Sequence, residues 1–199
     1  MKLPLALAIT GASGAVYGVR LLEVLLESGY DVHLTISPSG QIVIAQELNR
    51  TVDLEDFSLE SLLPGVSGPG TLRYHSYRDF LAPIASGSYL TGGMVICPCS
   101  GSTLSAVVHA SGSNLIQRAA DVHLKERRRL ILVPRETPLS SRQLENMRLA
   151  CDAGAVVLPA SPGWYHGVSS LQDLVDFIVA RILDQLSIPH TLMKRWGDH

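Results

Sequence analysis

Blocks of apolar residues follow one another along the chain, and their period changes from that of a strand to that of a helix. Residues Leu5 to Ile9 are apolar without interruption, as in a strand buried on both faces. After a run of small residues, apolar side chains return at Val16, Val19, Leu22 and Leu26, which is the spacing of one helix face. This pattern predicts a strand, a tight turn and a helix in direct succession.

The same alternation continues to the end of the chain. Further strands are expected at Asp31–Ser37, Leu72–His75, Met94–Cys97, Arg129–Arg135 and Ala155–Pro159. Further helices are expected at Gln41–Glu47, Leu104–Ala110, Asn114–Arg127, Ser140–Ala153 and Leu171–Leu186. Residues 51–70 are acidic and rich in Ser, Pro and Gly, which is typical of a surface excursion. Six strands alternating with helices predict one α/β domain over residues 1–199, a doubly wound parallel sheet of the Rossmann or flavodoxin-like kind with flanking helices.

The turn between the first strand and the first helix is built from small residues. Gly11 and Gly14 allow a tight turn and a close approach to a ligand, and the helix N-terminus offers N–H groups to an anion. The spacing Gly11-x-x-Gly14-x-x-x-Gly18 differs from the G-x-G-x-x-G of dinucleotide enzymes, and Ser37 stands where those enzymes carry an acid. The turn predicts a phosphate-binding site, with simple packing of the turn as the alternative.

A second run of small residues follows the fourth predicted strand in the same way. Residues 98–103 read PCSGST and lead into a helix. In an open parallel sheet, ligands bind outside the carboxyl ends of the strands, at the point where the strand order reverses. Two such turns at the expected places therefore indicate a ligand crevice. Cys97 and Cys99 are interpreted as core residues, because a lone C-x-C lacks partner ligands for a metal.

Composition narrows the class of protein. With 46% hydrophobic and 17% charged residues, the chain is an ordinary globular one whose apolar surface suits an oligomer. The formal net charge of −2 argues against a generally basic nucleic-acid binder. No stretch approaches the roughly 18 apolar residues of a membrane span. Three cysteines do not make a disulfide framework, which favours a cytoplasmic location.

Positive charge is concentrated in the second half of the chain. Residues 101–199 carry 11 Lys and Arg against 9 Asp and Glu, whereas the first hundred residues carry 5 against 9. Converging Arg and Lys side chains bind phosphate or diphosphate without a metal. The candidates are Arg118, Lys125, Arg135 and Arg181, together with Tyr165. For Arg118 and Lys125, a solvated helix face is the alternative.

Arg135 comes directly after a buried strand, at the edge where this architecture binds ligands. Glu136 beside it is either its salt-bridge partner or an acid–base group, and the sequence does not separate the two. Of the seven histidines, His166 is the best placed, in the loop after the sixth predicted strand, although a lone loop histidine is usually only a surface residue. The spacing of His and Cys residues indicates no metal site.

Several segments together resemble the UbiX-type flavin prenyltransferases. They are TGASGA at 10–15, VICPCSGSTLSA at 95–106, NLIQRAADVHLKERR at 114–128, LVPRETP at 132–138, PGWYH at 162–166 and RW at 195–196. The resemblance implies a flavodoxin-like fold and a metal-independent enzyme that transfers a dimethylallyl group from dimethylallyl monophosphate to N5 and C6 of reduced FMN. It implies that the product, prenylated FMN, serves UbiD-type decarboxylases, as in ubiquinone biosynthesis. It also implies a homo-oligomer, a dodecamer, with the site at subunit contacts and the tail 189–199 packed on a neighbouring subunit.

The resemblance also assigns residues. The FMN ligands that it implies are Gly11, Ala12, Ser13, Ser37, Ser100, Gly101, Ser102, Thr103 and Arg135. The residues that it places at the dimethylallyl phosphate are Lys125, Tyr165, Arg181 and Trp196. Its catalytic group comprises Ser13, Glu47, Glu136, Lys125 and Arg118. Trp196 and Phe80 are candidates to wall an allylic cation, although relatives carry tryptophan where Phe80 stands. A phenylalanine is common in place of Trp164, and this departure is expected to be tolerated.

Other functions fit parts of the sequence. FMN-dependent cysteine decarboxylases carry different residues at segments 98–103 and 134–138. Short-chain dehydrogenases share TGASG but need a Tyr-x-x-x-Lys pair, which none of the six tyrosines provides. A non-catalytic flavin-binding module does not call for Arg181, Lys125 and Tyr165. A decarboxylase acting directly on polyprenyl hydroxybenzoate needs room for a large carboxylated substrate. The prenyltransferase interpretation is therefore favoured, with an FMN-dependent decarboxylase and a flavin-binding module as the alternatives.

Overall fold

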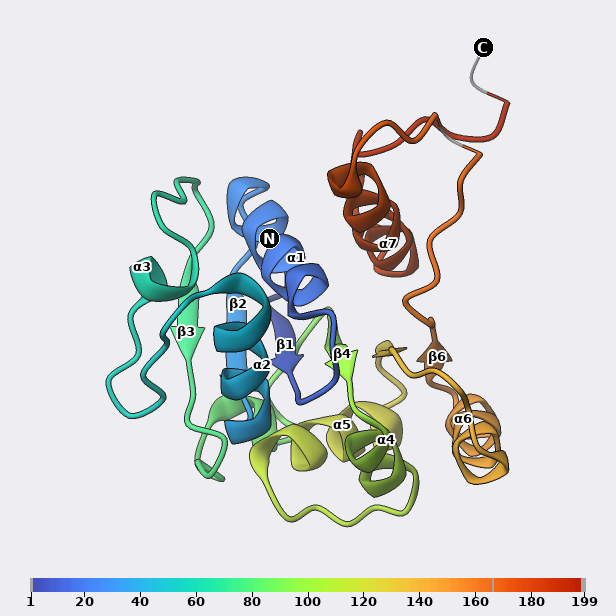
Figure 1. Cartoon of the computed structure of the whole chain (residues 1–199). Coiled ribbons are helices and arrows are strands. Elements are labelled where there is room, and N and C mark those ends of the chain that lie inside the picture. Colours follow the sequence, from blue (N-terminus) through green and yellow to red (C-terminus); the bar gives the residue numbers. More distant parts are fainter. Residues whose placement is uncertain (1, 166, 198–199) are drawn as a thin grey trace.

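The fold is a single parallel sheet, seen in a computed structural model that describes residues 2–165 and 167–197. Its strand order is β3-β2-β1-β4-β5-β6, and every pair of neighbours is parallel (Figure 1). The strands are β1 (Leu5–Ile9), β2 (Val32–Ile36), β3 (Leu72–Tyr74), β4 (Gly93–Cys99), β5 (Leu130–Pro134) and β6 (Val156–Val157). The doubly wound α/β architecture expected from the alternating pattern is confirmed.

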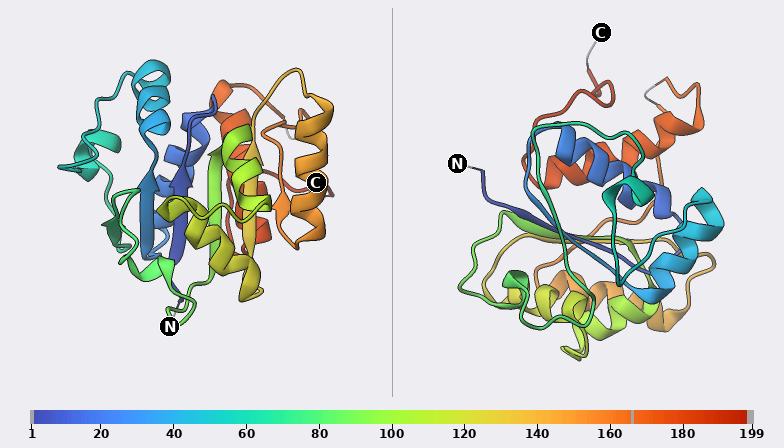
Figure 2. Two further views of the ribbon diagram at one scale, coloured as in Figure 1. Left: turned by 90° about the horizontal axis from the view of Figure 1, so that it is seen from below. Right: turned by 90° about the vertical axis from the view of Figure 1, so that its left-hand side faces the viewer.

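Helices cover both faces of the sheet, so the molecule has three layers (Figure 2). One face is covered by α1 (Ala15–Glu27), α2 (Pro38–Leu48) and α7 (Leu171–Gln185). The other is covered by α4 (Gly101–Val108), α5 (Leu115–Lys125) and α6 (Ser141–Asp152). The short helix α3 (Leu59–Leu62) lies in the predicted surface excursion, and a 3-10 turn, η1 (Pro83–Ala85), lies before β4. Each helical layer has its own apolar core against the sheet.

Two helices begin three residues earlier than the apolar pattern predicted, because serine caps start them. The Ser37 hydroxyl accepts a hydrogen bond from the Gly40 amide, and Pro38 suits the first helical position, so α2 starts before Gln41. The Ser100 hydroxyl accepts from the Thr103 amide, so α4 already includes residues 101–103. Both caps directly follow a strand, and both bring a helix N-terminus to the same edge of the sheet.

β4 is longer and β6 shorter than predicted. The register between β4 and β5 shifts between Ile96 and Cys99, and this irregularity lets the strand continue to Cys99, which pairs with Pro134. β6 has two residues, although the chain beyond it still bonds to β5 through the Leu158 and Ala160 amides. The predicted strand ends were therefore wrong by two residues or more at both places.

The strand order reverses between β1 and β4. From β1 the chain moves outward through β2 to β3, and then returns to place β4 on the other side of β1. Gly18 allows α1 to pack closely here, since a side chain on it would overlap the Cys97 carbonyl oxygen of β4. The carboxyl ends of β1 and β4 consequently flank the position where ligands bind in such sheets.

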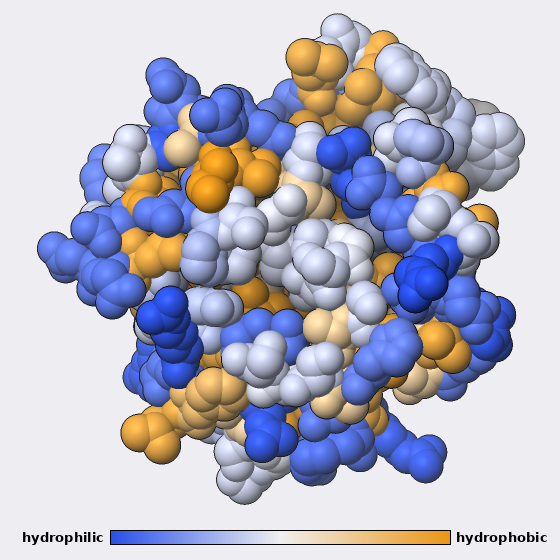
Figure 3. Space-filling model, turned by 60° about the horizontal axis from the view of Figure 1, so that its bottom comes forward, coloured by the Kyte–Doolittle hydropathy of each residue, from blue (hydrophilic) through white to orange (hydrophobic). Residues whose placement is uncertain are grey.

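The surface carries scattered apolar side chains. On the face drawn in Figure 3, apolar residues form separate patches among polar ones. Leu81, Leu171 and Trp196 are the most exposed large apolar side chains of the described residues, with Trp196 at 85%. Within the same residues, the helices are all too short or too polar to cross a membrane.

Candidate functional site

Thr10 fastens the turn after β1 to the turn after β4. Its hydroxyl donates to the Pro98 carbonyl oxygen at 2.8 Å and accepts from the Ser100 amide at 2.9 Å. Its own amide also donates to the Pro98 carbonyl oxygen, at 3.2 Å. Because Thr10 is buried, these hydrogen bonds hold the two turns in a fixed relation. Thr10 could not be identified from the sequence pattern, because its partners lie about 90 residues away.

The turn after β2 is hydrogen-bonded to the end of β1, next to these two turns. The Ser37 amide donates to the Ile9 carbonyl oxygen at 3.0 Å, beside the first glycine turn. A side chain on Gly11 would overlap Ser39, so glycine is needed for this close approach. Three strand-end turns, residues 10–14, 37–40 and 98–103, therefore form one continuous structure at the carboxyl edge of the sheet.

Glu47, near the end of α2, satisfies the N-terminus of α1. Its carboxylate accepts hydrogen bonds from the Gly14 amide at 2.8 Å and the Ala15 amide at 2.9 Å. These are the donors that the sequence analysis expected to bind a phosphate. An internal carboxylate takes that place, because the positive helix end favours any anion that can reach it. The phosphate-binding prediction was therefore wrong for these two amides.

The charge on Glu47 is stabilised where it lies. Burial raises the pKa of this carboxyl, but hydrogen bonds from the Ser13 side chain and the Gly14 and Ala15 amides, and the charge of Arg135, outweigh it and lower the pKa. The Arg135 guanidinium Nε also donates to the Ser13 carbonyl oxygen at 3.3 Å. Ser13, Glu47 and Arg135 thus lie together beside the first turn, with the Ser13 side chain exposed.

Glu136 does not pair with Arg135 within the described part of the chain. One of its carboxylate oxygens accepts from the Gln143 side-chain amide at 3.3 Å, and the other accepts from the Thr137 amide at 3.2 Å. Gln143 also belongs to the capping box that starts α6. Of the two interpretations of Glu136, the salt-bridge partner of Arg135 is therefore not the one seen here.

The residues at this edge suit FMN. The first two amides of α4, on Gly101 and Ser102, have no hydrogen-bond partner among residues 2–165 and 167–197, so they are available to an anion. The Ser100 hydroxyl contacts those of Ser102 and Thr103 at 3.1 and 2.9 Å, giving a polar rim. The half-buried Arg135 adds a positive charge nearby. Small residues, free amides and one guanidinium, here called the flavin cradle, are the groups that this edge offers to a flavin phosphate.

A second group of predicted residues lies around α7. The Tyr165 ring contacts the Phe177 ring with centroids 5.9 Å apart, and the Trp196 ring with centroids 5.5 Å apart. Arg181 lies one helical turn beyond Phe177 and pairs with Asp184 at 2.8 Å. The structure therefore brings Tyr165 and Trp196 together, and Arg181 lies one turn further along α7 than the Phe177 that Tyr165 contacts. His166 lies outside the described residues.

Lys125 and Arg118 lie on α5. Because α5 ends at Lys125 just before β5 begins, Lys125 is at the amino edge of the sheet, opposite Ser13. It pairs with Glu126 and lies over Gly87, where an added Cβ would be 2.7 Å from its Nζ. Arg118 pairs with Asp121 at 3.7 Å. Within one chain, Lys125 therefore does not meet the flavin cradle, and Phe80, 48% exposed, lies in the segment between β3 and β4.

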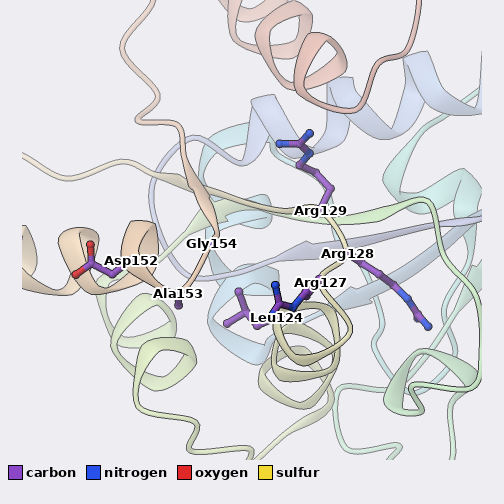
Figure 4. A pocket seen from close by; sticks show the side chains of 7 residues that line it. All are labelled: Leu124, Arg127, Arg128, Arg129, Asp152, Ala153 and Gly154. Carbon is purple, nitrogen blue, oxygen red and sulfur yellow. The ribbon is translucent and has the colours of Figure 1, made fainter.

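A cleft of about 750 Å³ also opens at the amino edge (Figure 4). It lies between the ends of α5 and α6, and its charged lining residues are Arg127, Arg128, Arg129 and Asp152. Arg128 points away from Asp152 and donates to the backbone oxygens of Tyr89 and Gly87 at 2.6 and 2.5 Å. Because this cleft is at the opposite edge from the strand-end turns, it is separate from the flavin cradle.

Comparison with known proteins agrees with this architecture. Residues 1–183 match the family model described as Flavoprotein. The chain is 50% identical to the flavin prenyltransferase UbiX of Pseudomonas aeruginosa, over 98% of this chain and 94% of the relative. It is 47% identical to the flavin prenyltransferase UbiX of Halalkalibacterium halodurans, over 96% and 91%.

Solved structures point the same way. The crystal structure of AnUbiX in complex with FMN and dimethylallyl pyrophosphate matches with a TM-score of 0.87 and 36% identity, covering 99% of this chain and 98% of that one. A dodecameric FMN-dependent UbiX-like decarboxylase from Escherichia coli O157:H7 matches with a TM-score of 0.85 and 37% identity, over 98% and 100%. The cysteine decarboxylase TvaF, at 16% identity and a TM-score of 0.60, shares the fold alone. The chain therefore belongs to the family of UbiX flavin prenyltransferases, among the flavoproteins.

Proposed function

We propose that this chain transfers a dimethylallyl group from dimethylallyl monophosphate to N5 and C6 of reduced FMN without a metal. The observation that carries the proposal is the gathering of Ser13, Glu47 and Arg135 at the reversal point of the sheet. It occurs in a chain 36% identical to a protein crystallised with FMN and a prenyl diphosphate. When bound, reduced FMN supplies the nucleophilic ring atoms that accept the prenyl unit.

The flavin side of the site is assigned to the carboxyl edge. Gly11, Ala12 and Ser13 line one side of the cradle, and Ser37 caps the neighbouring helix. The turn on the other side, with the free amides of α4, is formed by Ser100, Gly101, Ser102 and Thr103. Arg135 holds negative charge between the two sides. Because the hydrogen bonds of Thr10 fix these turns, the cradle is preorganised before FMN arrives.

The phosphate side is assigned to neighbouring copies of the chain. Lys125 lies at the opposite edge of the sheet from Ser13, so it can meet a flavin cradle only when another copy brings its amino edge there. The phosphate side has a second group of residues, Arg181, Tyr165 and Trp196. Arg118 on α5 adds a further positive charge. A dodecamer is proposed on this basis, in line with the dodecameric relative, with the tail 189–197 facing a neighbouring subunit.

The reaction needs charge stabilisation and proton handling from these residues. Fixed Arg, Lys and Tyr donors stabilise the charge that accumulates on the departing phosphate. Ser13 and Glu47 share a hydrogen bond, so the pair can hold or move a proton at the Ser13 hydroxyl. Glu136, positioned by Gln143, is the second candidate for proton transfer. Trp196 and Phe80 supply apolar walls for an allylic cation.

The product is proposed to serve a UbiD-type decarboxylase, as in ubiquinone biosynthesis, and the enzyme to work in the cytoplasm. Purified protein with reduced FMN and dimethylallyl monophosphate, without added magnesium, should give a flavin heavier by one prenyl unit in mass spectrometry. An unchanged flavin mass would remove the proposal. Ser13→Ala and Glu136→Gln should slow turnover while FMN stays bound, and loss of FMN binding would instead give these residues a structural role.

A further inference from the structure

The carboxylate of Asp184, near the end of α7, accepts hydrogen bonds from three side chains. Its Oδ2 accepts from Arg181 Nη1 at 2.8 Å, and its Oδ1 accepts from Arg195 Nη2 at 2.8 Å and from His190 Nε2 at 3.1 Å. The Asp184 side chain is 17% exposed and that of His190 only 3%. Ion pairs on the open surface contribute little, whereas a half-enclosed carboxylate with several partners is held firmly.

Hydrogen bonds set the charge state of Asp184. The Leu192 amide donates to His190 Nδ1 at 3.4 Å, and His190 Nε2 faces both the Asp184 carboxylate, at 3.1 Å, and Arg195 Nη2, at 3.3 Å. Burial raises the pKa of Asp184, but hydrogen bonds from Arg195 and His190 outweigh it and lower the pKa. Asp184 therefore stays a carboxylate at neutral pH and holds both arginines through charge.

Two sets of contacts link the tail to the last helix, α7. Arg195 is directly followed by Trp196, whose ring lies against Tyr165 with an interplanar angle of 79°. Tyr165 in turn lies against Phe177, one helical turn before Arg181. The tail is therefore linked to α7 at two places, directly through Asp184 and indirectly through Tyr165, whose ring contacts both Trp196 and Phe177. Moving one place would disturb the other.

We propose that Asp184 and His190 form a latch that positions Arg181 and Trp196 together to receive the phosphate end of the prenyl donor. The inference rests on the proposed function and adds two positioning residues to it. Asp184 holds the Arg181 guanidinium ready in the empty enzyme. An arriving phosphate dianion binds other N–H groups of that guanidinium, while Asp184 keeps Arg195 and His190, and with them the tail, on the helix. Without the latch, Arg181 and Trp196 become independent, and the cost of ordering them falls on donor binding.

Trp196 itself provides the readout. The chain has two tryptophans, so in a Trp164→Phe background Trp196 is the only one. Adding Asp184→Asn should lower the fluorescence anisotropy of Trp196 in the absence of any substrate. It should raise KM for dimethylallyl monophosphate by about 10-fold, because Arg181 and Trp196 must then be ordered when the donor binds. His190→Ala should do the same to a smaller extent, His190→Gln should restore part of the loss, and the Kd of FMN should stay within twofold.

Asp176→Asn is the matched control on the same helix. Asp176 is 15% exposed and pairs with Arg20 at 2.8 Å, but it does not hold the tail. This variant should lower thermal stability and leave the Trp196 anisotropy and KM unchanged. Equal effects of Asp184→Asn and Asp176→Asn, or an unchanged Trp196 signal in Asp184→Asn, would overturn the latch. A wild-type protein that does not alter FMN overturns the proposed function instead, since the substrate-free anisotropy decides the latch by itself.

Discussion

The two halves of the proposed site are built in opposite ways. At the carboxyl edge, buried Thr10 joins the turns after β1 and β4 by short hydrogen bonds, the Ser37 amide adds the turn after β2, and Gly11 allows a close approach to Ser39. Around α7 and at the end of α5, the corresponding residues are exposed side chains such as Trp196 and Lys125, held by ion pairs and ring contacts. The flavin half thus belongs to the core of one chain, whereas the phosphate half belongs to surfaces. Only the second can be assembled from several copies, and only the second can change without disturbing the fold.

The largest expected effect is a loss of stability that disturbs the flavin half of the site together with the whole fold. In Gly18→Ala, the new methyl group would overlap the Cys97 carbonyl oxygen, and α1 would have to move away from β4. We expect the free energy of unfolding to fall by about 3 kcal/mol, as for other overpacked sites. Urea denaturation measures it. Gly92→Ala is the control, because the nearest atom to its Cβ would be 3.4 Å away, and a comparable loss there would contradict the packing argument.

The next prediction tests whether Lys125, in the phosphate half of the site, comes from another copy of the chain. Lys125→Ala should slow turnover about 100-fold, as removal of a preorganised donor does elsewhere, while FMN binding is kept. Lys2→Ala, another lysine at the amino edge, should leave turnover unchanged. Mixed oligomers of Ser13→Ala and Lys125→Ala subunits should then regain activity, since some sites combine intact residues of both. A mixture no more active than its components would contradict the assignment of Ser13 and Lys125 of one site to different copies.

Replacing Arg135 separates flavin binding from folding. Arg135→Gln should raise the Kd of FMN about 10- to 100-fold, because a charged hydrogen bond contributes about 1.5–3 kcal/mol. Fluorescence titration of FMN measures this change. Arg148→Gln, on the exposed face of α6, should have no effect on FMN. If Arg135→Gln lowered the melting temperature and left the Kd alone, Arg135 would be a structural residue.

The smallest effect concerns the segment that carries Phe80. His33 Nδ1 lies 2.7 Å from His75 Nε2, and His33 Nε2 lies 2.8 Å from the Tyr89 hydroxyl, so the two rings fasten this segment to β2. Burial first, and then the charges of His75 and Arg73, lower the pKa of His33 to about 4. Burial also lowers the pKa of His75.

A pKa lowered in the folded state means that the unfolded chain binds more protons in mild acid. Stability is therefore fully present above the unfolded pKa of about 6.5 and is lost as the pH falls toward the folded pKa. For His33 the loss between pH 6.5 and 5.5 should be about 1 kcal/mol. In His33→Gln this acid-side slope should shrink, as measured by urea denaturation across that range. An unchanged slope would show that protonation of His33 is not the cause of the loss of stability.

The strands and the two strand-end turns at the reversal point followed from periodicity, because a buried parallel sheet leaves long apolar runs and small residues at strand ends. The helix starts at Ser37 and Ser100 were missed by three residues, although Ser is itself a capping signal. The contact of Glu47 with Gly14 joins residues 33 positions apart, and that of Asp184 with Arg195 joins a helix to a tail. Neither has a spacing rule, since both arise only when separate elements pack together.

The position of Glu47 has a consequence for the chain before any flavin binds. A helix end that depended on a cofactor phosphate would leave polar amides unsatisfied in every newly synthesised molecule. Glu47 supplies that negative charge from within the polypeptide. The N-terminus of α1 can thus form before a cofactor is bound, whereas the first two amides of α4 stay available to a ligand.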